Sequence, residues 1–310
     1  LGYKITLHCF EYGRGEQKEL EKYASEVIYY PRKKSVLDWL SSTPFIVKSR
    51  KNNLLLQNLK RDNSPILFEG IHTTGFLTDL GLKNRIKLVR CHNIEHDYYN
   101  ALAQRPSGLK SIFYKSEAKK LAKYEAILSE ASALLVIQNK DLEHFNKINP
   151  NTHLLPASLP EIEVIEHKIV KDYMLFHGNL SVSENDYAAQ WIIQNVSPKV
   201  EGLPLIIAGL NPSIELQNLC TINGIDLRSN LPQSEMDTLV SEAKIHVLYT
   251  NQATGLKLKL LSALQSNGAV IVSSEMISGT DLGEHCLIAN TANEFVKHIQ
   301  DCNLEPLNAD

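Results

Sequence analysis

The chain has 310 residues, 43% of them hydrophobic and 22% charged, and this balance excludes an intrinsically disordered protein. Its 32 Lys and Arg against 35 Asp and Glu give a formal charge of -3, which lacks the basic excess typical of nucleic-acid-binding proteins. The length predicts two domains, because compact domains usually hold about 100–200 residues, and apolar runs such as residues 133–137 are too short to span a membrane.

The first half of the chain alternates short β-rich runs with helical patterns, which is typical of parallel sheets wound with helices. In the longest helical stretch, residues 116–130, the apolar and small residues recur at a spacing that places them on one face of a helix. The expected strands lie at 4–9, 27–30, 66–68, 87–91 and 134–137, and the expected helices at 16–23, 54–59, 95–103 and 116–130.

A polar stretch without periodicity, residues 158–171, separates the two halves and is predicted to be a linker. It would join a domain of residues 1–157 to a domain of residues 172–310. Both halves have the pattern of an α/β fold, and we expect two Rossmann-like, doubly wound domains that face a cleft. The expected strands of the second half are 173–176, 205–208, 225–227, 245–249, 269–272 and 286–289.

Two helices of the second half have a recognisable apolar face. The first is expected to begin with Ser183 as its N-cap, and the second to span residues 255–266. Side chains expected to point inward are Tyr187, Ala188, Trp191 and Ile192 in the first helix, and Leu256, Leu260, Leu261 and Leu264 in the second.

The five cysteines are scattered along the chain and have no C-x-x-C spacing. An odd number without paired spacing predicts reduced thiols rather than a disulfide framework or a zinc knuckle. We therefore expect a cytoplasmic protein without a bound metal, and peripheral contact with the inner face of the membrane stays open. The cysteines are Cys9, Cys91, Cys220, Cys286 and Cys302.

A glycine follows the first strand of the second half, in residues 176–181 (FHGNLS). Glycine at a strand-to-helix turn lets backbone N–H groups approach an anion, and the start of the next helix favours negative charge. Gly178 and Asn179 are therefore candidates for a phosphate site. The alternative is a tight turn that needs glycine for its backbone alone, because a single glycine is a weaker signal than G-x-G-x-x-G.

Residues 252–264 (QATGLKLKLLSAL) form a second strand-to-helix junction, with Lys257 and Lys259 in the first turns of the helix. Two ammonium groups beside a helix start could hold a diphosphate. The alternative is a solvated helix face, since lysines two positions apart point in different directions. Both junctions follow strands of the same predicted sheet, so we expect them to converge on one nucleoside diphosphate.

These junctions resemble the donor site of retaining glycosyltransferases with the GT-B fold, the large group that includes sucrose synthases and bacterial mannosyltransferases. Residues 255–264 (GLKLKLLSAL) are similar to the donor helix G-[IL]-K-x-K-x-x-E-A-[ML], and residues 204–212 to the strand L-x-[IV]-A-G-x-x-P. The resemblance implies Lys259 as a catalytic residue that stabilises the leaving diphosphate. The donor-binding residues it implies are Gly178, Asn179, Gly209, Asn230, Thr254, Gly255, Leu256, Lys257 and Ser262.

One position departs from the family pattern. The family's glutamate that binds the nucleotide ribose is replaced by Ser262. A serine hydroxyl offers one short hydrogen bond, and a charge-assisted bond is about twice as strong as a neutral one. This departure leaves open a rearranged ribose site, a weakly bound donor, or a GT-B-fold protein that binds a nucleotide or glycan without turnover.

Residues 90–96 (RCHNIEH) follow a clear strand and begin a helix. In the resembled family a histidine at this strand end faces the acceptor and the transferred sugar, and His92 matches it as the second catalytic residue. The string H-x-x-E-H also fits inverted zinc proteases, but His92 at a strand end and His96 in a helix would not share one helix face. Helix-capping histidines are a further alternative. The acceptor-side residues that the resemblance implies are His72, Arg90 and Asn93.

The expected function is transfer of a hexose, with retention, from a GDP- or UDP-linked sugar to a glycan or lipid-linked acceptor. We expect neither a metal nor a further cofactor, no nucleic-acid partner, and a role in cell-surface polysaccharide biosynthesis. Residues 1–7 are similar to the second strand of these enzymes, so the first strand, its loop and its helix, roughly 30 residues, are expected to lie outside the given chain. An epimerase or phosphorylase of related architecture is the remaining alternative.

Overall fold

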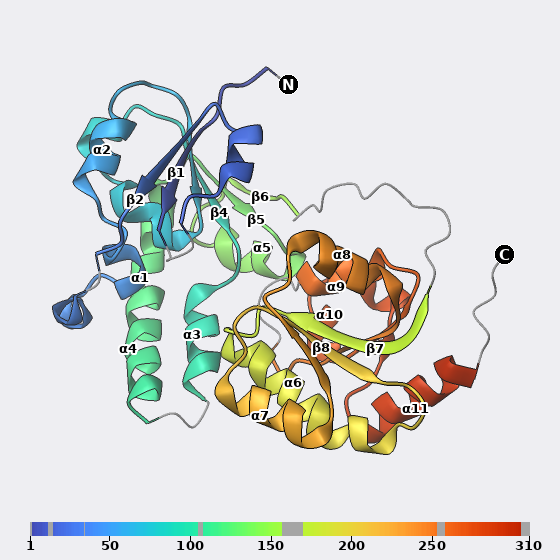
Figure 1. Ribbon diagram of the computed structural model, residues 1–310. Coiled ribbons are helices and arrows are strands. Elements are labelled where there is room, and N and C mark those ends of the chain that lie inside the picture. The colour runs from blue at the N-terminus through green and yellow to red at the C-terminus, as the bar shows by residue number, and fades with distance from the viewer. Residues whose placement is uncertain are drawn as a thin grey trace. The chain divides into compact units, whose positions relative to one another are not determined.

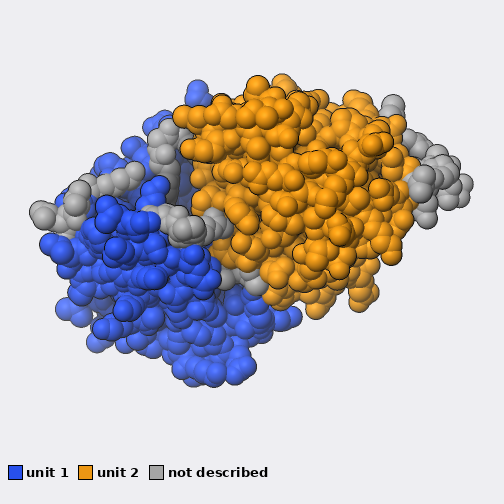
Figure 2. Space-filling view, turned by 90° about the horizontal axis from the view of Figure 1, so that it is seen from below, with its two compact units in different colours: residues 1–156 blue, residues 157–310 orange. Residues whose placement is uncertain are grey.

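The computed structural model describes residues 2–11, 15–33, 35–104, 108–156, 170–252 and 258–304. The chain divides into two compact units, residues 1–156 and 157–310, coloured separately in Figure 2. Both units contain parallel sheets connected by helices, as the ribbon in Figure 1 shows, so the predicted fold class is confirmed. Most of the predicted linker, residues 158–169, lies outside the described residues, and the acceptor-side and donor-side assignments of the two units stay predictions.

The first unit holds a four-stranded parallel sheet in the order β3-β4-β5-β6 and a separate parallel pair, β1 and β2. The 3₁₀ segments η3 (Ile71–Phe76) and η5 (Glu125–Glu130) lie next to the larger sheet. The strands are β1 (Thr6–Phe10), β2 (Glu26–Tyr30), β3 (Ile66–Glu69), β4 (Lys87–Cys91), β5 (Ala133–Val136) and β6 (Thr152–Leu154). The helices are α1 (Phe45–Lys48), α2 (Asn53–Leu59), α3 (Glu95–Ala103), α4 (Leu109–Tyr124) and α5 (Asn139–Asn146).

A buried tyrosine connects the two sheets of the first unit. Tyr30, at the end of β2, is fully buried and belongs to the same core as Phe68, Val89 and Leu134 of the four-stranded sheet. Its hydroxyl accepts a hydrogen bond from Nδ2 of Asn58 in α2 at 2.7 Å. Because a buried hydroxyl without a partner is costly, this bond fixes the position of the β1–β2 pair.

The second unit is built on a six-stranded parallel sheet in the order β12-β11-β10-β7-β8-β9. The chain runs outward from β7 to β9 and then returns to β10 on the other side, so the strand order switches between β7 and β10. The strands are β7 (Lys171–Gly178), β8 (Leu205–Gly209), β9 (Asp226–Ser229), β10 (Ala243–Leu248), β11 (Ala269–Val272) and β12 (Leu287–Ile288). The helices are α6 (Ser183–Asn195), α7 (Ile214–Asn223), α8 (Gln233–Glu242), α9 (Leu258–Leu264), α10 (Ser274–Ile277) and α11 (Ala292–Leu304).

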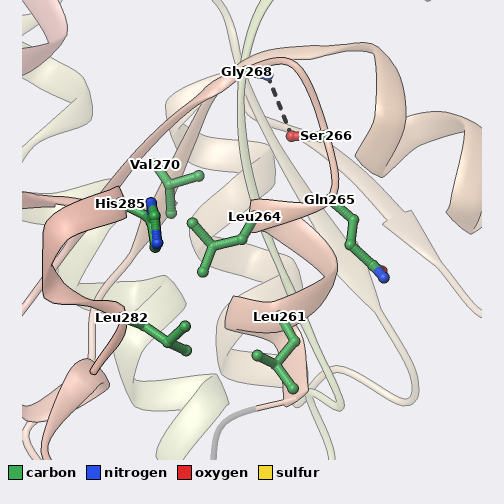
Figure 3. A pocket seen from close by; sticks show the side chains of 8 residues that line it. All are labelled: Leu261, Leu264, Gln265, Ser266, Gly268, Val270, Leu282 and His285. Atoms are coloured by element: carbon green, nitrogen blue, oxygen red, sulfur yellow. Dashed lines mark hydrogen bonds between the residues drawn. The ribbon is translucent and has the colours of Figure 1, made fainter. Parts of the chain in front are cut away.

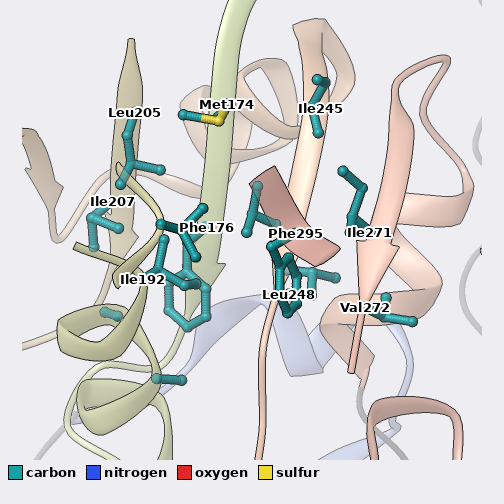
Figure 4. Packing of buried hydrophobic residues seen from close by; sticks show 14 of the residues in the cluster. Met174, Phe176, Ile192, Leu205, Ile207, Ile245, Leu248, Ile271, Val272 and Phe295 are labelled. Carbon is teal, nitrogen blue, oxygen red and sulfur yellow. The ribbon is translucent and has the colours of Figure 1, made fainter. Parts of the chain in front are cut away.

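Both faces of this sheet are covered, which explains its runs of consecutive apolar residues. On one face Met174 and Phe176 of β7 pack with Ile192 of α6 and Phe295 of α11, as Figure 4 shows. On the other face Leu175 packs with residues of α8. Side chains that alternate along β7 therefore enter two different cores.

The structure corrects several expectations about individual residues. Ser183 is the first helical residue of α6 rather than its N-cap, which is Val182 and makes no side-chain capping bond. Tyr187 was expected to be buried but is 46% exposed. Helix α4 begins at Leu109, seven residues before the predicted start, 116, and its predicted end is the 3₁₀ segment η5. Leu256 lies outside the described residues.

Glycine is required at position 209 because two strands approach closely. Gly209 pairs with Gly178 at the ends of β8 and β7. A Cβ atom on Gly209 would lie 1.8 Å from the carbonyl oxygen of Gly178, which is far inside van der Waals contact. The sheet itself therefore explains this glycine.

We predict that Gly209→Ala destabilises the protein by at least about 1–3 kcal/mol, the range for overpacking in a well-packed region. Chemical denaturation monitored by circular dichroism measures the change. Gly283→Ala is the matched control, because there the nearest atom is a flexible Ile277 methyl at 3.3 Å. If Gly209→Ala is as stable as the wild type, the Gly178 carbonyl oxygen does not lie close enough to position 209 to require glycine there.

Two buried imidazoles make the second unit sensitive to acid. The rings of His177 in β7 and His246 in β10 lie 5.9 Å apart. Burial lowers the pKa of His246 to about 4, and burial, His246 and Lys259 lower the pKa of His177 well below 6.5. The unfolded chain binds protons at these histidines below pH 6.5 and the folded chain does not, so stability is full above pH 6.5 and is lost as the pH falls toward 4.

We predict that His246→Gln, which cannot take up this proton, flattens the fall of the unfolding free energy between pH 6.5 and pH 4. Uptake of one proton changes the free energy of unfolding by up to about 1.4 kcal/mol per pH unit, which amounts to roughly 3 kcal/mol between pH 6.5 and pH 4. Urea unfolding at a series of pH values measures the slope. An unchanged slope in the variant would show that His246 is not the titrating group.

Candidate functional site

The candidate site lies at the carboxyl ends of β7 and β10, where the strand order of the second unit switches. In open α/β sheets, ligands bind outside the carboxyl ends of strands at such a switch point. The loop after β7 leads into α6, and the loop after β10 leads toward α9. Part of the second loop carries the predicted donor residues Thr254, Gly255, Leu256 and Lys257, and these four lie outside the described residues.

Lys259 connects the two loops. Its Nζ donates a hydrogen bond to Oδ1 of Asn185 at 2.8 Å and lies 4.7 Å from the centre of the Phe176 ring. Nδ2 of Asn185 donates to the carbonyl oxygen of Asn179 at 2.9 Å. The structure therefore brings Lys259 of α9 next to the turn that follows β7, and a cation over an aromatic face is held in place by the ring's electrostatics.

Gly178 allows this close packing. A Cβ atom at this position would lie 3.3 Å from the side-chain amide of Asn185. In the turn itself, Oδ1 of Asn179 accepts hydrogen bonds from the backbone N–H and the hydroxyl of Ser181. The Asn179 side chain thus shapes the turn before α6, which is a frequent role of asparagine.

A cavity of about 210 Å³ opens beside this turn. His177, which the sequence analysis did not single out, contributes to its wall and is 5% exposed. Nε2 of His177 has no hydrogen-bond partner among the described residues. An unsatisfied buried polar atom in a cavity wall is a natural contact for a ligand; the only signal for it in the sequence is its place directly before Gly178. The cavity is lined by His177, Gly178, Asn179, Gly209, Leu210, Leu231, Gln233 and Met236.

Asn230 lies at the end of the edge strand β9, next to the end of β8. Its backbone has a φ of 57°, and its backbone N–H donates to the carbonyl oxygen of Gly209 at 2.9 Å. Its Oδ1 accepts a hydrogen bond from the backbone of Asn211 at 2.9 Å. Asparagine tolerates this left-handed conformation better than most residues. The backbone conformation of the turn is therefore sufficient to explain why asparagine occupies position 230.

A buried carboxylate braces the same edge of the sheet. Glu184, in the first turn of α6, is 6% exposed and accepts a hydrogen bond from the hydroxyl of Thr250, which follows β10. The backbone N–H of Thr250 donates to Oγ of Ser273, and this hydroxyl donates back to the Thr250 carbonyl. Glu184 lies after β7, Thr250 after β10 and Ser273 after β11. These hydrogen bonds therefore connect the segments that follow three strands of the sheet.

Ser262 lies one turn after Lys259 in α9 and is half-buried. Its hydroxyl donates to the carbonyl oxygen of Leu258 at 3.3 Å, four residues earlier. This back-bond is common for serine within helices. The hydroxyl therefore has a partner within its own helix, and its role toward a ribose stays a prediction.

In the first unit, the predicted acceptor-side residues gather at the carboxyl ends of β3 and β4. Nε2 of His92 donates to Oε2 of Glu69 at 2.8 Å, and Arg90 lies 3.9 Å from the other oxygen of that carboxylate. Hydrogen bonding to His92 holds the pKa of Glu69 below its usual value. Burial, together with the nearby positive charge of Arg50, lowers the pKa of His72 to about 3, so this imidazole is neutral at pH 7.

Asn93 follows His92, and its buried Oδ1 has no hydrogen-bond partner among the described residues. The next histidine, His96, lies in the first turn of α3 and faces Glu125 and His144 instead of His92. The two histidines of the H-x-x-E-H string therefore have different partners, as the sequence analysis anticipated. His96, Glu125 and His144 together could supply ligands to a metal ion.

A further cavity of about 600 Å³ lies elsewhere in the second unit. Figure 3 shows it beside the last turns of α9, where Leu261 and Leu264 line it together with His285. Gly268, at its margin, precedes β11, so this cavity is at the amino end of that strand. It contains none of the predicted site residues, and both leucines, expected in the core, are only half-buried here.

Comparisons with known proteins agree with this architecture. Residues 171–303 match the family model described as glycosyl transferases group 1. A curated relative from Klebsiella pneumoniae, described as an uncharacterized 44.6 kDa protein in the cps region, is 28% identical over 318 residues, which cover 95% of this chain and 80% of the relative. Among the described residues, no helix combines the length and the apolar character that a membrane crossing needs.

Solved structures share the fold at low sequence identity. HepE of Anabaena, determined with UDP and glucose, superposes with a TM-score of 0.61 at 10% identity, covering 97% of this chain and 90% of HepE. TarM, known from S. aureus, superposes with a TM-score of 0.59 at 12% identity over 83% of this chain, and this chain spans half of TarM's length. Residues 171–303 are thus similar to a glycosyltransferase group 1 domain, and the solved structures share the fold of the chain.

Proposed function

We propose that the protein transfers a sugar from a nucleoside diphosphate donor to a glycan or lipid-linked acceptor, with retention. The observation that carries the proposal is the contact of Lys259 with Asn185 and Phe176, which holds a cation at the switch point of the sheet. The family match over residues 171–303 supports glycosyl transfer, and it favours an enzyme over a protein that only binds a nucleotide.

The donor diphosphate would lie between the turn at Gly178 and the start of α9. When the bond to the sugar breaks, negative charge develops on the leaving diphosphate. A cation already held in place stabilises this charge without further reorganisation. The N-terminus of α6, which follows the turn, adds the positive end of a helix dipole. In this proposal the positioned cation is the main catalytic contribution of the second unit.

The nucleoside would occupy the cavity next to His177. The neutral imidazole offers either a donor or an acceptor at Nε2, and the apolar side chains of Leu231 and Met236 would cover a base. UDP is present in the HepE structure, and the resemblance leaves GDP as the second option. Both nucleotides therefore belong in the first experiment.

The acceptor would be bound by the first unit. The imidazole of His92, oriented by Glu69, would position acceptor or sugar hydroxyl groups, with His72, Arg90 and Asn93 at the same strand ends. The Klebsiella relative is described as lying in a cps region, which supports the predicted role in cell-surface polysaccharide biosynthesis. A cytoplasmic location, expected from the scattered cysteines, is part of this proposal.

We predict that Lys259→Ala weakens UDP or GDP binding by about 1–3 kcal/mol, the range for hydrogen bonds to charged groups. Isothermal titration calorimetry with both nucleotides measures the loss. Lys199→Ala is the matched control, since Lys199 also donates to an asparagine, Asn293, at 3.0 Å but on an exposed surface. If Lys259→Ala binds UDP or GDP as tightly as the wild type does, Lys259 is not part of the donor site.

We further predict that Ser262→Glu, which restores the residue of the resembled family, raises nucleotide affinity by about 0.5–1.5 kcal/mol, the worth of one added net hydrogen bond. The hydroxyl of Ser262 bonds only weakly to its own helix, so little is lost on replacement. Nucleotide affinity and melting temperature are measured together. A fall in both would mean that the carboxylate is buried without a partner and that no ribose docks at this position.

A further inference from the structure

Three side chains from separate elements of the first unit converge at a point that the donor chemistry does not use. They are His96 in the first turn of α3, Glu125 at the start of η5, directly after α4, and His144 in α5. Each offers one nitrogen or carboxylate oxygen, and these atoms all lie within 4.8 Å of one another. Glu125 is 5% exposed, so its charge is largely removed from water and needs compensation.

The spacing of these atoms is close to that of ligands around one ion. Nδ1 of His96 lies 3.6 Å from Oε1 of Glu125, beyond the range of a good hydrogen bond. Two atoms bound at about 2.1 Å to one tetrahedral zinc ion lie about 3.4 Å apart. Nε2 of His144 lies 2.7 Å from the other oxygen of Glu125, and this pair would separate by under about 1 Å to admit a metal.

Further carboxylates surround the three side chains. Oδ1 of Asp97 lies 3.6 Å from Nε2 of His96 and adds a second carboxylate beside this imidazole. Asp141, three residues before His144 on α5, is 3% exposed, and its buried Oδ2 has no hydrogen-bond partner among the described residues. A buried carboxylate oxygen without a partner is unusual in a purely structural ion-pair cluster, and the charge of His144 acts on this carboxylate.

We propose that His96, Glu125 and His144 form a binding site for one divalent transition-metal ion, with Zn²⁺ as the best match. Two imidazoles and one carboxylate suit zinc and leave a fourth position for water. Imidazole ligands disfavour Mg²⁺ and Ca²⁺, which take oxygen ligands. The ion would hold the ends of α3, α4 and α5 together below the loop that carries His92.

The first experiment uses tag-free protein treated with a chelator and then titrated with ZnCl₂ by calorimetry, with metal content measured after dialysis. The expected result is about one tightly held zinc ion per chain and a higher melting temperature when zinc is present. His144→Ala, at a half-exposed helix position, should weaken zinc binding by at least about 100-fold, since loss of even an outer-shell partner costs about 10–100-fold. His153→Ala is the control, because His153 is also an exposed histidine of the first unit with a single hydrogen bond, to Asn151.

A second measurement uses the unaltered protein and does not depend on the folding of a variant. Co²⁺ added to the metal-free protein should develop the intense visible absorption of a four-coordinate site, and one equivalent of Zn²⁺ should abolish it. Binding of less than a tenth of an equivalent of zinc, weak absorption typical of six-coordinate Co²⁺, or unchanged zinc affinity in His144→Ala would each overturn the proposal. Nucleotide affinity of the second unit is a separate readout, so this test and that of Lys259 can fail independently.

Discussion

Strand β7 is the element on which the second unit depends. It pairs with β10 on one side and β8 on the other, and its alternate side chains enter the cores on both faces of the sheet. Its last residues, His177 and Gly178, begin the candidate site. The close approach of Gly178 to Gly209 sets how near the ends of β7 and β8 lie. A change in this pairing would displace the cavity, the turn at Asn179 and the anchor of Lys259 together.

Charged and polar side chains are concentrated at the carboxyl ends of the strands in both units. In the second unit Glu184 is satisfied by Thr250, and Lys259 by Asn185 and the ring of Phe176. In the first unit Glu69 is satisfied by His92. Side chains at strand ends can reach a ligand while the strands below them stay rigid, because the hydrogen-bonded sheet fixes the backbone from which they project.

The two units divide the chemistry by the kind of group they offer. The described edge of the second unit combines a positioned cation with a helix start and a neutral imidazole, and this combination supports the proposed nucleoside diphosphate. The first unit offers His92, Arg90 and neutral His72, to which we assign hydroxyl groups of an acceptor in the proposed function. The separate cluster of His96, Glu125 and His144 lies behind these residues, on the helices that support their loops, so a metal there would act on the geometry of the loops rather than on the bond that is broken.

Local patterns in the sequence were sufficient for the fold class and for most strands. The strands β4 and β11 have the predicted bounds. In β11 four consecutive apolar residues leave few alternatives in a covered parallel sheet. Helices such as α7 were not predicted, because only Leu216 and Cys220 of α7 are buried and its apolar face is weak. The start of α6 was misjudged by one residue at Ser183. Tyr187 lies outside the buried face of this helix, which Ala188, Ala189, Ile192 and Ile193 form together with Glu184.

The sequence by itself indicated that the two strand-to-helix junctions lie at one edge of a sheet, because parallel strands of one sheet end at the same edge. Only the tertiary structure decided which atoms meet there: that Lys259 reaches Asn185, that Gly209 is required by the backbone of Gly178, and that His177 faces a cavity. The same holds for His96, because the fold places it beside Glu125 and His144, two contacts that the H-x-x-E-H string does not indicate. Contacts between residues far apart in the chain depend on how helices pack on the sheet, and no local spacing of residues carries that information.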